Sequence, residues 1–224
     1  MNKKIVKFTN DDNFSKYSLE ISDKFCPYLK PAEKNNVLHL TEYKLSGNHM
    51  EELQEEIFYY GVIHTEELRR FRQNNKNSPK GILICENLKF ISPPMFNEID
   101  GEELFSWPHW LLKILYTKSG VMFGKFWIGE KTISRSGDKI PEPPCHFLSI
   151  RSVIKERDPY FFSKAPELLP QLIHSIDNGE NVHTPLLPAG CDIFSMESMK
   201  KYKYFSIVLC WAQEQLNRKA EQST

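Results

Sequence analysis

The residues of this chain best able to do chemistry are histidines, cysteines and arginines that stand in apolar surroundings. His109 follows a proline in a segment rich in Trp and Leu, Cys145 directly precedes His146, and Arg151 ends a largely apolar run. Polar and charged side chains are rare inside proteins unless a partner satisfies them. Each of these residues is therefore a candidate for a functional site.

His109 has two interpretations. A buried imidazole in an aromatic-rich segment can be the axial ligand of haem iron, given an apolar slot and a group that holds the propionates. The alternative is a core histidine whose ring is hydrogen-bonded to the backbone. A zinc or non-haem iron site is not expected, because no H-x-x-x-H or H-x-H pattern and no carboxylate at ligand spacing surrounds any of the 7 histidines.

Two cysteines are candidate nucleophiles. Cys145 and His146 place a thiol beside an imidazole, the groups that thiol-dependent hydrolases combine. Neighbouring side chains of a strand point to opposite faces, so this adjacency does not by itself pair a nucleophile with a base. Cys26 is the second candidate, because Pro27 forces a sharp turn that should expose it.

Arg151 is the candidate anchor for a ligand. It lies on an expected strand made of Ile, Leu, Phe and Val, where a guanidinium needs an anionic partner. That partner is either an internal Asp or Glu or the carboxylate of a bound molecule. Arg135 and Lys139 lie in a polar excursion, residues 129–144, and could close over the same anion. Long loops without structure of their own are often binding loops or lids.

The pattern of elements predicts one α+β domain over residues 1–224, a small mixed or antiparallel sheet packed against several helices. Residues 1–12 should form an edge strand or a loose arm, and residues 219–224 a frayed tail. Strands are expected at 37–45, 81–86, 121–128 and 145–154, the last alternating with His146, Leu148 and Ile150 toward the core. Helices are expected at 13–25, at 49–72 in two pieces broken near Gly61, at 100–118 with a kink or fresh start near Pro108, from Pro166 onward, and at 195–219 as a long core helix.

Composition limits the class of partner. Lys plus Arg equals Asp plus Glu, 29 against 29, so the positive field typical of nucleic-acid binders is missing. The N-terminus is too short and polar for a signal peptide, and no run approaches the roughly 18 apolar residues of a membrane span. Five cysteines without C-x-x-C favour neither disulfides nor a thiolate zinc site, and Cys85 and Cys210 lie in apolar runs that favour the core. We expect a cytoplasmic protein with a small-molecule or protein partner. A homodimer is compatible with the sequence.

Four blocks of the chain resemble an uncharacterised bacterial domain family: C-P-Y at 26–28, H-W-L-L-K at 109–113, G-V-M-F-G-K-F-W at 120–127 and P-C-H-F-L-S-I-R at 144–151, with Asp158-Pro159 beyond them. Members of that family tend to show C-P-F, a helical His with Leu-Lys, G-L-M-I-G-x-F-H-P and P-x-P-L-L-A-I-R in this order. The similarity covers roughly residues 20 to 175. The family is distantly similar to the YqcI/YcgG proteins, some of which are haem-dependent oxygenases that hydroxylate nitrogen of amino-acid substrates.

The resemblance implies roles for particular residues. Cys26, His109 and Arg151 occupy matching motif positions, with His109 as the helix histidine and Arg151 near the ligand. Trp127 stands where the family pattern has the histidine best placed to hold haem iron. Either His109 or His146 takes over as ligand, or this chain has lost haem and kept the pocket.

Three functions follow as hypotheses. The first is a biosynthetic tailoring enzyme, a haem-dependent monooxygenase of the N-hydroxylase type in which Arg151 holds the carboxylate of an amino-acid-like substrate. The second is a non-catalytic protein on the same scaffold that binds a small molecule or a protein partner, which the replacement at Trp127 favours. The third is a thiol-dependent hydrolase that uses Cys145 or Cys26.

Overall fold

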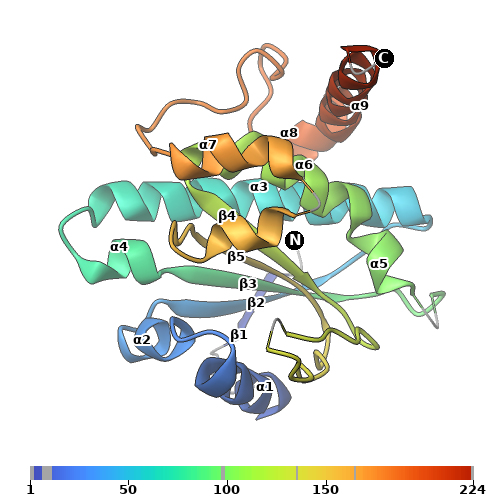
Figure 1. The fold of residues 1–224 in the computed structure, drawn as a ribbon. Coiled ribbons are helices and arrows are strands. Elements are labelled where there is room, and N and C mark those ends of the chain that lie inside the picture. The colour runs from blue at the N-terminus through green and yellow to red at the C-terminus, as the bar shows by residue number, and fades with distance from the viewer. Residues whose placement is uncertain (1–2, 7–11, 97–98, 135, 164, 223–224) are drawn as a thin grey trace.

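A five-stranded mixed β-sheet lies at the centre of the structure, a computed structural model that describes residues 3–6, 12–96, 99–134, 136–163 and 165–222 (Figure 1). The strands are β1 (Lys3–Val6), β2 (Leu38–Lys44), β3 (Cys85–Ile91), β4 (Val121–Phe126) and β5 (His146–Ser152). They lie in the order β1-β2-β3-β5-β4. β2 and β3 are parallel, and the other neighbouring pairs are antiparallel. The α+β class predicted from the sequence is confirmed.

Helices cover both faces of this sheet. The α-helices are α1 (Asp12–Lys24), α2 (Leu29–Lys34), α3 (Met50–Asn74), α4 (Pro79–Leu83), α5 (Gly101–Leu104), α6 (Ser106–Tyr116), α7 (Leu169–Ile173), α8 (Met196–Lys201) and α9 (Tyr204–Gln222). The 3-10 turns are η2 (Thr117–Ser119), η3 (Asp158–Phe162) and η4 (Pro166–Leu168). α3 and α6 lie on one face, and α1 and α2 lie on the other (Figure 1). Parallel neighbours need a crossover, and α3 makes the crossover from β2 to β3.

The larger apolar cluster fills the space between the sheet and α3 with α6. Leu53, Ile57 and Phe58 of α3 are fully buried in it. Tyr43 of β2 stacks on Tyr60 of α3 with ring centroids 3.7 Å apart. Burial of these large side chains supplies most of the driving force that holds α3 on the sheet.

Strand β5 shows the alternation predicted from its sequence. Leu148 and Ile150 belong to the larger cluster, under α3 and α6. Phe147 belongs to a second, smaller cluster, where it packs against Phe14 and Tyr17 of α1. Both faces of the strand are therefore covered, so the polar residues on β5 need partners inside the protein.

Several predicted boundaries are confirmed. α1 and β2 lie where the periodicity indicated. The Asp100 side chain accepts hydrogen bonds from the backbone of Glu102 and Glu103 and caps α5. The predicted break near Pro108 is present, because α5 ends at Leu104 and α6 starts afresh at Ser106. Residues 3–6 of the N-terminal arm form the edge strand β1.

The predicted break of the 49–72 helix at Gly61 is wrong. α3 runs without interruption from Met50 to Asn74, and Gly61 is the point at which α6 approaches it. A Cβ on Gly61 would lie 2.5 Å from Cδ1 of Leu112. Glycine is needed there for helix packing, and the tertiary contacts outweigh its low helix propensity.

Two further predictions are corrected. Residues 79–83 form α4, so the strand predicted at 81–86 begins only at Cys85. The predicted helix 195–219 is divided into α8 and α9 at Lys203, whose φ of 52° is left-handed. α9 buries one face through Tyr204, Phe205, Val208 and Ala212, whereas Cys210, predicted in the core, is exposed.

No helix in the described part of the chain combines the length and the apolar character that crossing a membrane requires.

Candidate functional site

A pocket of about 450 Å³ opens where β5 ends and β4 begins. We call it the basic pocket. Its volume is typical of sites for small molecules. Six separate stretches of the chain form its walls, and the lining residues are Tyr28, Arg72, Asn75, Lys76, Gly81, Ile82, Ser119, Gly120, Ser152, Val153, Ile154, Lys155, Glu156, Ser175 and Asp177.

Hydrogen bonds to backbone carbonyls fix the floor of the basic pocket. Arg72 at the end of α3 donates to the carbonyl oxygens of Ser119 (2.7 Å) and Gly120 (2.9 Å). Gly120 has a φ of 66°, a left-handed conformation that glycine adopts readily, and it ends the helical segment before β4. Elsewhere in the lining, Lys155 Nζ donates to the carbonyl oxygen of Ser175 at 3.1 Å.

The lining carries more positive than negative charge. Arg72, Lys76 and Lys155 are its cations, and Glu156 and Asp177 are its carboxylates. Asp177 is already neutralised, because Arg72 Nη2 lies 2.6 Å from one of its oxygens and Arg69 Nη2 lies 2.9 Å from the other. An anion entering the pocket would therefore meet a positive field.

Ser175 Oγ is buried at the wall of the basic pocket and has no hydrogen-bond partner among the described residues. Buried polar atoms in proteins are nearly always hydrogen-bonded, so an orphaned hydroxyl calls for a ligand or a water. A hydroxyl can donate to an anion. The pocket thus combines a cationic field with a hydroxyl that is buried at its wall and lacks a partner among the described residues.

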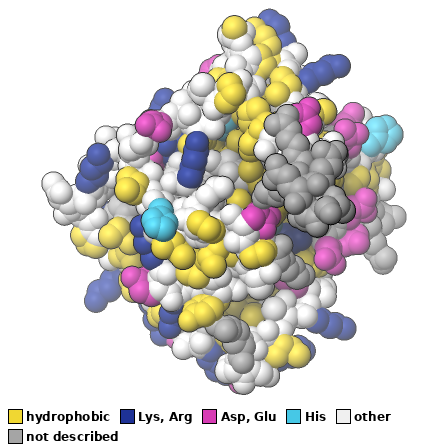
Figure 2. All heavy atoms as spheres, turned by 45° about the horizontal axis from the view of Figure 1, so that its top comes forward, with side chains coloured by type: hydrophobic (Ala, Val, Ile, Leu, Met, Phe, Trp, Pro, Cys, Tyr) yellow, Lys and Arg dark blue, Asp and Glu magenta, His cyan; other side chains and the backbone are white. Residues whose placement is uncertain are grey.

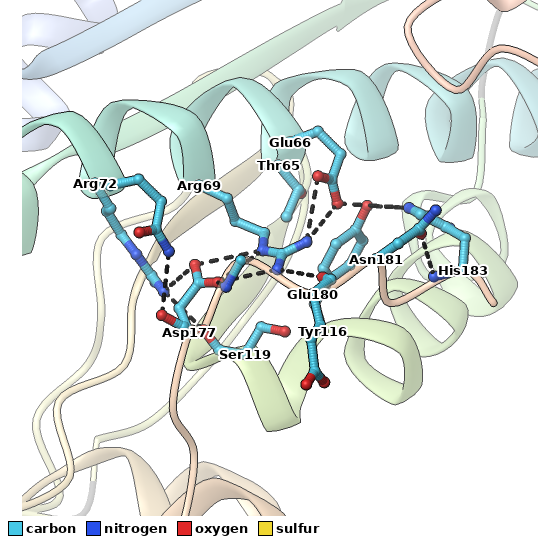
Figure 3. A network of polar contacts seen from close by, with 12 residues as sticks. Thr65, Glu66, Arg69, Arg72, Tyr116, Ser119, Asp177, Glu180, Asn181 and His183 are labelled. Carbon is cyan, nitrogen blue, oxygen red and sulfur yellow. Dashed lines mark hydrogen bonds and ion pairs between the residues drawn. The ribbon is translucent and has the colours of Figure 1, made fainter.

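Behind the basic pocket lies a buried network of ionic groups, drawn in Figure 3. Arg69 donates to Asp177, to Glu66 (3.0 Å) and to the carbonyl oxygen of Glu180 (2.7 Å). Burial alone would raise the pKa of Asp177, but Arg69 and Arg72 outweigh it and hold that pKa below its ordinary value. The network ties the segment after α7 to α3.

The far end of the network is a histidine enclosed by two tyrosines. His183 is fully buried, with Nε2 2.8 Å from Tyr116 Oη and Nδ1 2.6 Å from Tyr204 Oη. Glu66 Oε1 lies 3.5 Å from Nε2. Burial acts to raise the pKa of Glu66, and His183 and Arg69 together lower it below the usual range. The side chains at this end of the network lie outside the lining of the basic pocket, so we assign them a structural role.

Arg151 is paired with an internal carboxylate. Its Nη1 and Nη2 donate to the two oxygens of Asp158 at 2.8 and 2.7 Å, and Asp158 is fully buried. Of the two partners allowed by the sequence, the geometry matches the internal Asp. Cys26 is half-buried. Burial acts to lower the pKa of Arg151, whereas Asp158 raises it, and Cys26 lies close enough to Arg151 to raise it further. The turn at Pro27 therefore brings Cys26 to Arg151, next to the basic pocket.

His109 lies on α6 beside the edge strand β4. Its Nε2 is 3.2 Å from the carbonyl oxygen of Phe123, the backbone partner that the core interpretation required. Burial, together with Lys113 and Lys125, lowers the pKa of His109 to about 3. Lys113, one turn further along α6, has a pKa lowered to about 8 by burial and by Lys125, and its Nζ lies 4.9 Å from the centre of the Phe162 ring.

Two of the residues implied for haem, His109 and Trp127, do not fit that group as they are packed. His109 Nε2 is engaged by the Phe123 carbonyl. Trp127 fills the space beside α5, because a Cβ added to Gly101 would lie 2.2 Å from the Cβ of Trp127. The basic pocket is lined by neither residue. In the described residues, no group of three or more His, Cys, Asp or Glu side chains could hold a metal ion.

Cys145 and His146 are separated by the sheet, as their adjacency on a strand predicted. Cys145 is buried in the smaller cluster with Phe147, and its neighbour in sequence lies on the other face of β5. His146 Nδ1 is buried without a hydrogen-bond partner in the described structure, and burial lowers the pKa of the ring. Arg135 lies outside the described residues. Lys139 lines a second, smaller hollow against α1.

A second polar chain, missed by sequence reasoning, lies between α3 and the sheet. His39 Nδ1 is 2.6 Å from Glu86 Oε1, and His64 Nδ1 is 3.4 Å from Glu86 Oε2. Tyr43 Oη completes it at 2.6 Å from His64 Nε2. Burial acts to raise the pKa of Glu86, but the two histidines overcome that effect and lower it to about 2. His39 and Glu86 are close together because the register of β2 on β3 pairs these two residues.

Comparisons with protein-family models, curated proteins and solved structures found no match to this chain. The resemblance described from the sequence blocks is neither supported nor contradicted by them.

Proposed function

We propose that the protein binds a small carboxylate-bearing molecule in the basic pocket. The observation that carries this proposal is the coincidence, at one wall, of excess positive charge with the orphaned hydroxyl of Ser175. Charge attracts an anion from any direction, whereas a buried hydroxyl fixes where one oxygen must lie. The combination favours a carboxylate whose oxygen accepts from Ser175 Oγ.

The cations have different roles in this proposal. Arg72 already donates to Asp177 and to two backbone carbonyls, so it acts on a ligand through its field. Lys155 is exposed and donates to the Ser175 carbonyl, and it can turn its ammonium group to a bound carboxylate. Lys76, also exposed, adds charge at the rim.

Titration with butyrate at low ionic strength, followed by NMR or calorimetry, tests the proposal. Lys155→Met should weaken binding by about two- to fivefold, the range of one partly exposed ion pair. Lys16→Met removes an exposed lysine from α1, far from the pocket lining, and should leave the affinity unchanged. Superimposable curves for wild type and Lys155→Met would contradict the proposal.

Ser175→Ala separates a ligand-binding role from a structural one. The hydroxyl makes no bond in the described structure, so its removal should leave the free energy of unfolding unchanged or slightly higher. The affinity for butyrate should fall by at least about tenfold, since a hydrogen bond to a charged group contributes roughly 1.5–3 kcal/mol. A variant that loses stability but binds butyrate normally would assign Ser175 to the fold instead.

A tailoring enzyme is the second candidate. The observation that favours it is the pair of strongly perturbed groups on α6, His109 and Lys113, because shifted pKa values gather at active sites. Such a site would keep a neutral imidazole and a readily deprotonated amine side by side at neutral pH. The haem-dependent N-hydroxylation implied by the resemblance stays a prediction, and no step is assigned through haem because His109 and Trp127 do not fit it.

A further inference from the structure

We infer that the ligand of the basic pocket is an amphipathic monoanion: one carboxylate attached to an apolar chain that lies over Tyr28 and Ile82. This inference rests on the proposed carboxylate site and adds the class of molecule that the site takes. It follows from two properties of the lining, the presence of apolar side chains beside the polar ones and its small net charge.

The lining of the basic pocket combines polar and apolar side chains. Arg72 contacts Ser119, Gly120 and Asp177, and Lys155 contacts Ser175. α4 supplies Ile82, and Tyr28, the residue before α2, also lines the pocket. The Ser152 hydroxyl lies 3.4 Å from the carbonyl oxygen of Gly81, the neighbour of Ile82 in the chain. A molecule in the pocket can therefore contact cations and hydroxyls together with hydrocarbon.

One exposed isoleucine lies in the lining, and another lies between two lining residues in the chain. Ile82 lines the pocket with 66% of its surface exposed, and Ile176, between the lining residues Ser175 and Asp177, is 74% exposed. Val153 and Ile154 of the lining are only half-buried. A single exposed isoleucine needs no explanation, but apolar side chains that converge on one pocket are typical of a site that hydrocarbon covers.

The small net charge of the lining argues against a highly charged ligand. Figure 2, which brings the α7 side of the molecule forward, shows hydrophobic side chains mixed with isolated basic and acidic ones. In the basic pocket itself, three cations face two carboxylates. An excess of one positive charge suits a monoanion better than a polyphosphate, which would need several more cations or a row of backbone donors.

A series of straight-chain carboxylates from acetate to octanoate, each kept below its micelle-forming concentration, tests the inference by calorimetry or NMR titration. Affinity should rise by about two- to fourfold for each added methylene that becomes buried. Octanoate should then bind at least about tenfold more tightly than butyrate. Lys155→Met should weaken every member by a similar factor, because all share the carboxylate.

Ile82→Ser isolates the apolar contact. In this variant the affinity for octanoate should exceed that for butyrate by about threefold or less. The affinity for acetate should change little. Ile133→Ser is the matched control, since Ile133 is 70% exposed and lies outside the pocket lining. It should preserve the full dependence on chain length.

The outcomes distinguish the two proposals. Equal affinities along the series, with the Lys155→Met effect intact, would overturn the amphipathic ligand and leave the carboxylate site standing. An unchanged chain-length dependence in Ile82→Ser would also overturn it, because the hydrocarbon would lie elsewhere. If no member of the series binds, the proposed function falls together with the inference.

Discussion

At the scale of single residues, Arg151 shows how a charge inside a sheet is satisfied. Its guanidinium holds both oxygens of Asp158, and the same carboxylate accepts from the backbone N–H of Ile154 at 2.6 Å. The chain therefore folds back on itself directly after β5. The carboxylate that neutralises Arg151 is seven residues away in sequence, and the lysines of the basic pocket remain as the groups able to attract a ligand.

Arg151→Met should lower the free energy of unfolding by about 3 kcal/mol, because it leaves the buried Asp158 carboxylate without its counter-charge. Butyrate affinity should not change, since Arg151 does not line the basic pocket. Urea unfolding and butyrate titration measure the two effects, with Arg157→Met, on an exposed arginine, as control. Normal stability with lost binding would return Arg151 to the role of ligand anchor.

His109 is the residue on which the haem hypothesis depends. With Nε2 directed to the Phe123 carbonyl, the ring would have to break a hydrogen bond and reorient before that nitrogen could ligate iron. We expect protein incubated with haemin to show no bound-haem Soret band after gel filtration. A band present in the wild type and absent from His109→Ala would prove this expectation wrong and name the axial ligand.

At the scale of elements, the contact between α3 and α6 depends on one glycine. Gly61→Ala should destabilise the protein by about 1–3 kcal/mol through overpacking against Leu112, which exceeds the roughly 1 kcal/mol that alanine gains in helix propensity. In a Leu112→Ala background the same change should be neutral or stabilising, because the clashing methyl group is gone. Thermal or urea unfolding of the wild type, the two single variants and the double variant measures the coupling energy between Gly61 and Leu112. An equal penalty in both backgrounds would exclude the contact as its cause.

How far the sequence predicts these elements depends on the range of the interactions that form them. α1, β2 and the Asp100 cap follow from local periodicity and capping, so they could be predicted. Gly61 could not, because its role depends on Leu112, a residue 51 positions away that meets it only in the folded protein. Lys203 adopts a left-handed conformation that a sequence pattern normally signals with glycine or asparagine.

The candidate site was harder to predict than the fold. Its lining comes from the residue before α2, the end of α3, α4, the turn before β4, the β5 exit and the segment after α7. None of these pieces is unusual in composition, and Ser175 becomes distinctive only because the folded structure leaves its hydroxyl without a partner among the described residues. Asp158-Pro159, which follows the resembling blocks, places a carboxylate within reach of Arg151, but neither Asp158 nor Arg151 lines the basic pocket.

At the scale of the whole molecule, the buried network holds the long segment between α7 and α8 against the helical layer. Asp177 connects to α3 through two arginines, and His183 connects to α6 and α9 through Tyr116 and Tyr204. This segment has little regular structure of its own, so these polar contacts replace the backbone bonds that a helix or strand would supply.

The same network makes stability depend on pH. Asp177 and Glu66 have lowered pKa values in the folded protein, so each contributes stability above its unfolded pKa of about 4 and loses it as the pH falls through the lower folded value. Asp177→Asn, which resembles the protonated acid, should therefore destabilise the protein by about 2–4 kcal/mol at neutral pH. The difference in the free energy of unfolding between Asp177→Asn and the wild type should become smaller as the pH falls below about 4, because the wild-type carboxylate is then protonated as well.

Urea unfolding of both proteins at neutral and acidic pH measures this difference. Glu51→Gln, on an exposed glutamate in the first turn of α3, should match the wild type at both pH values. A difference that stays constant with pH would mean that the introduced amide disturbs packing rather than charge. If the difference in the free energy of unfolding disappears at acidic pH, the charge of the Asp177 carboxylate stabilises the fold. This carboxylate, which Arg69 and Arg72 share, also lines the basic pocket.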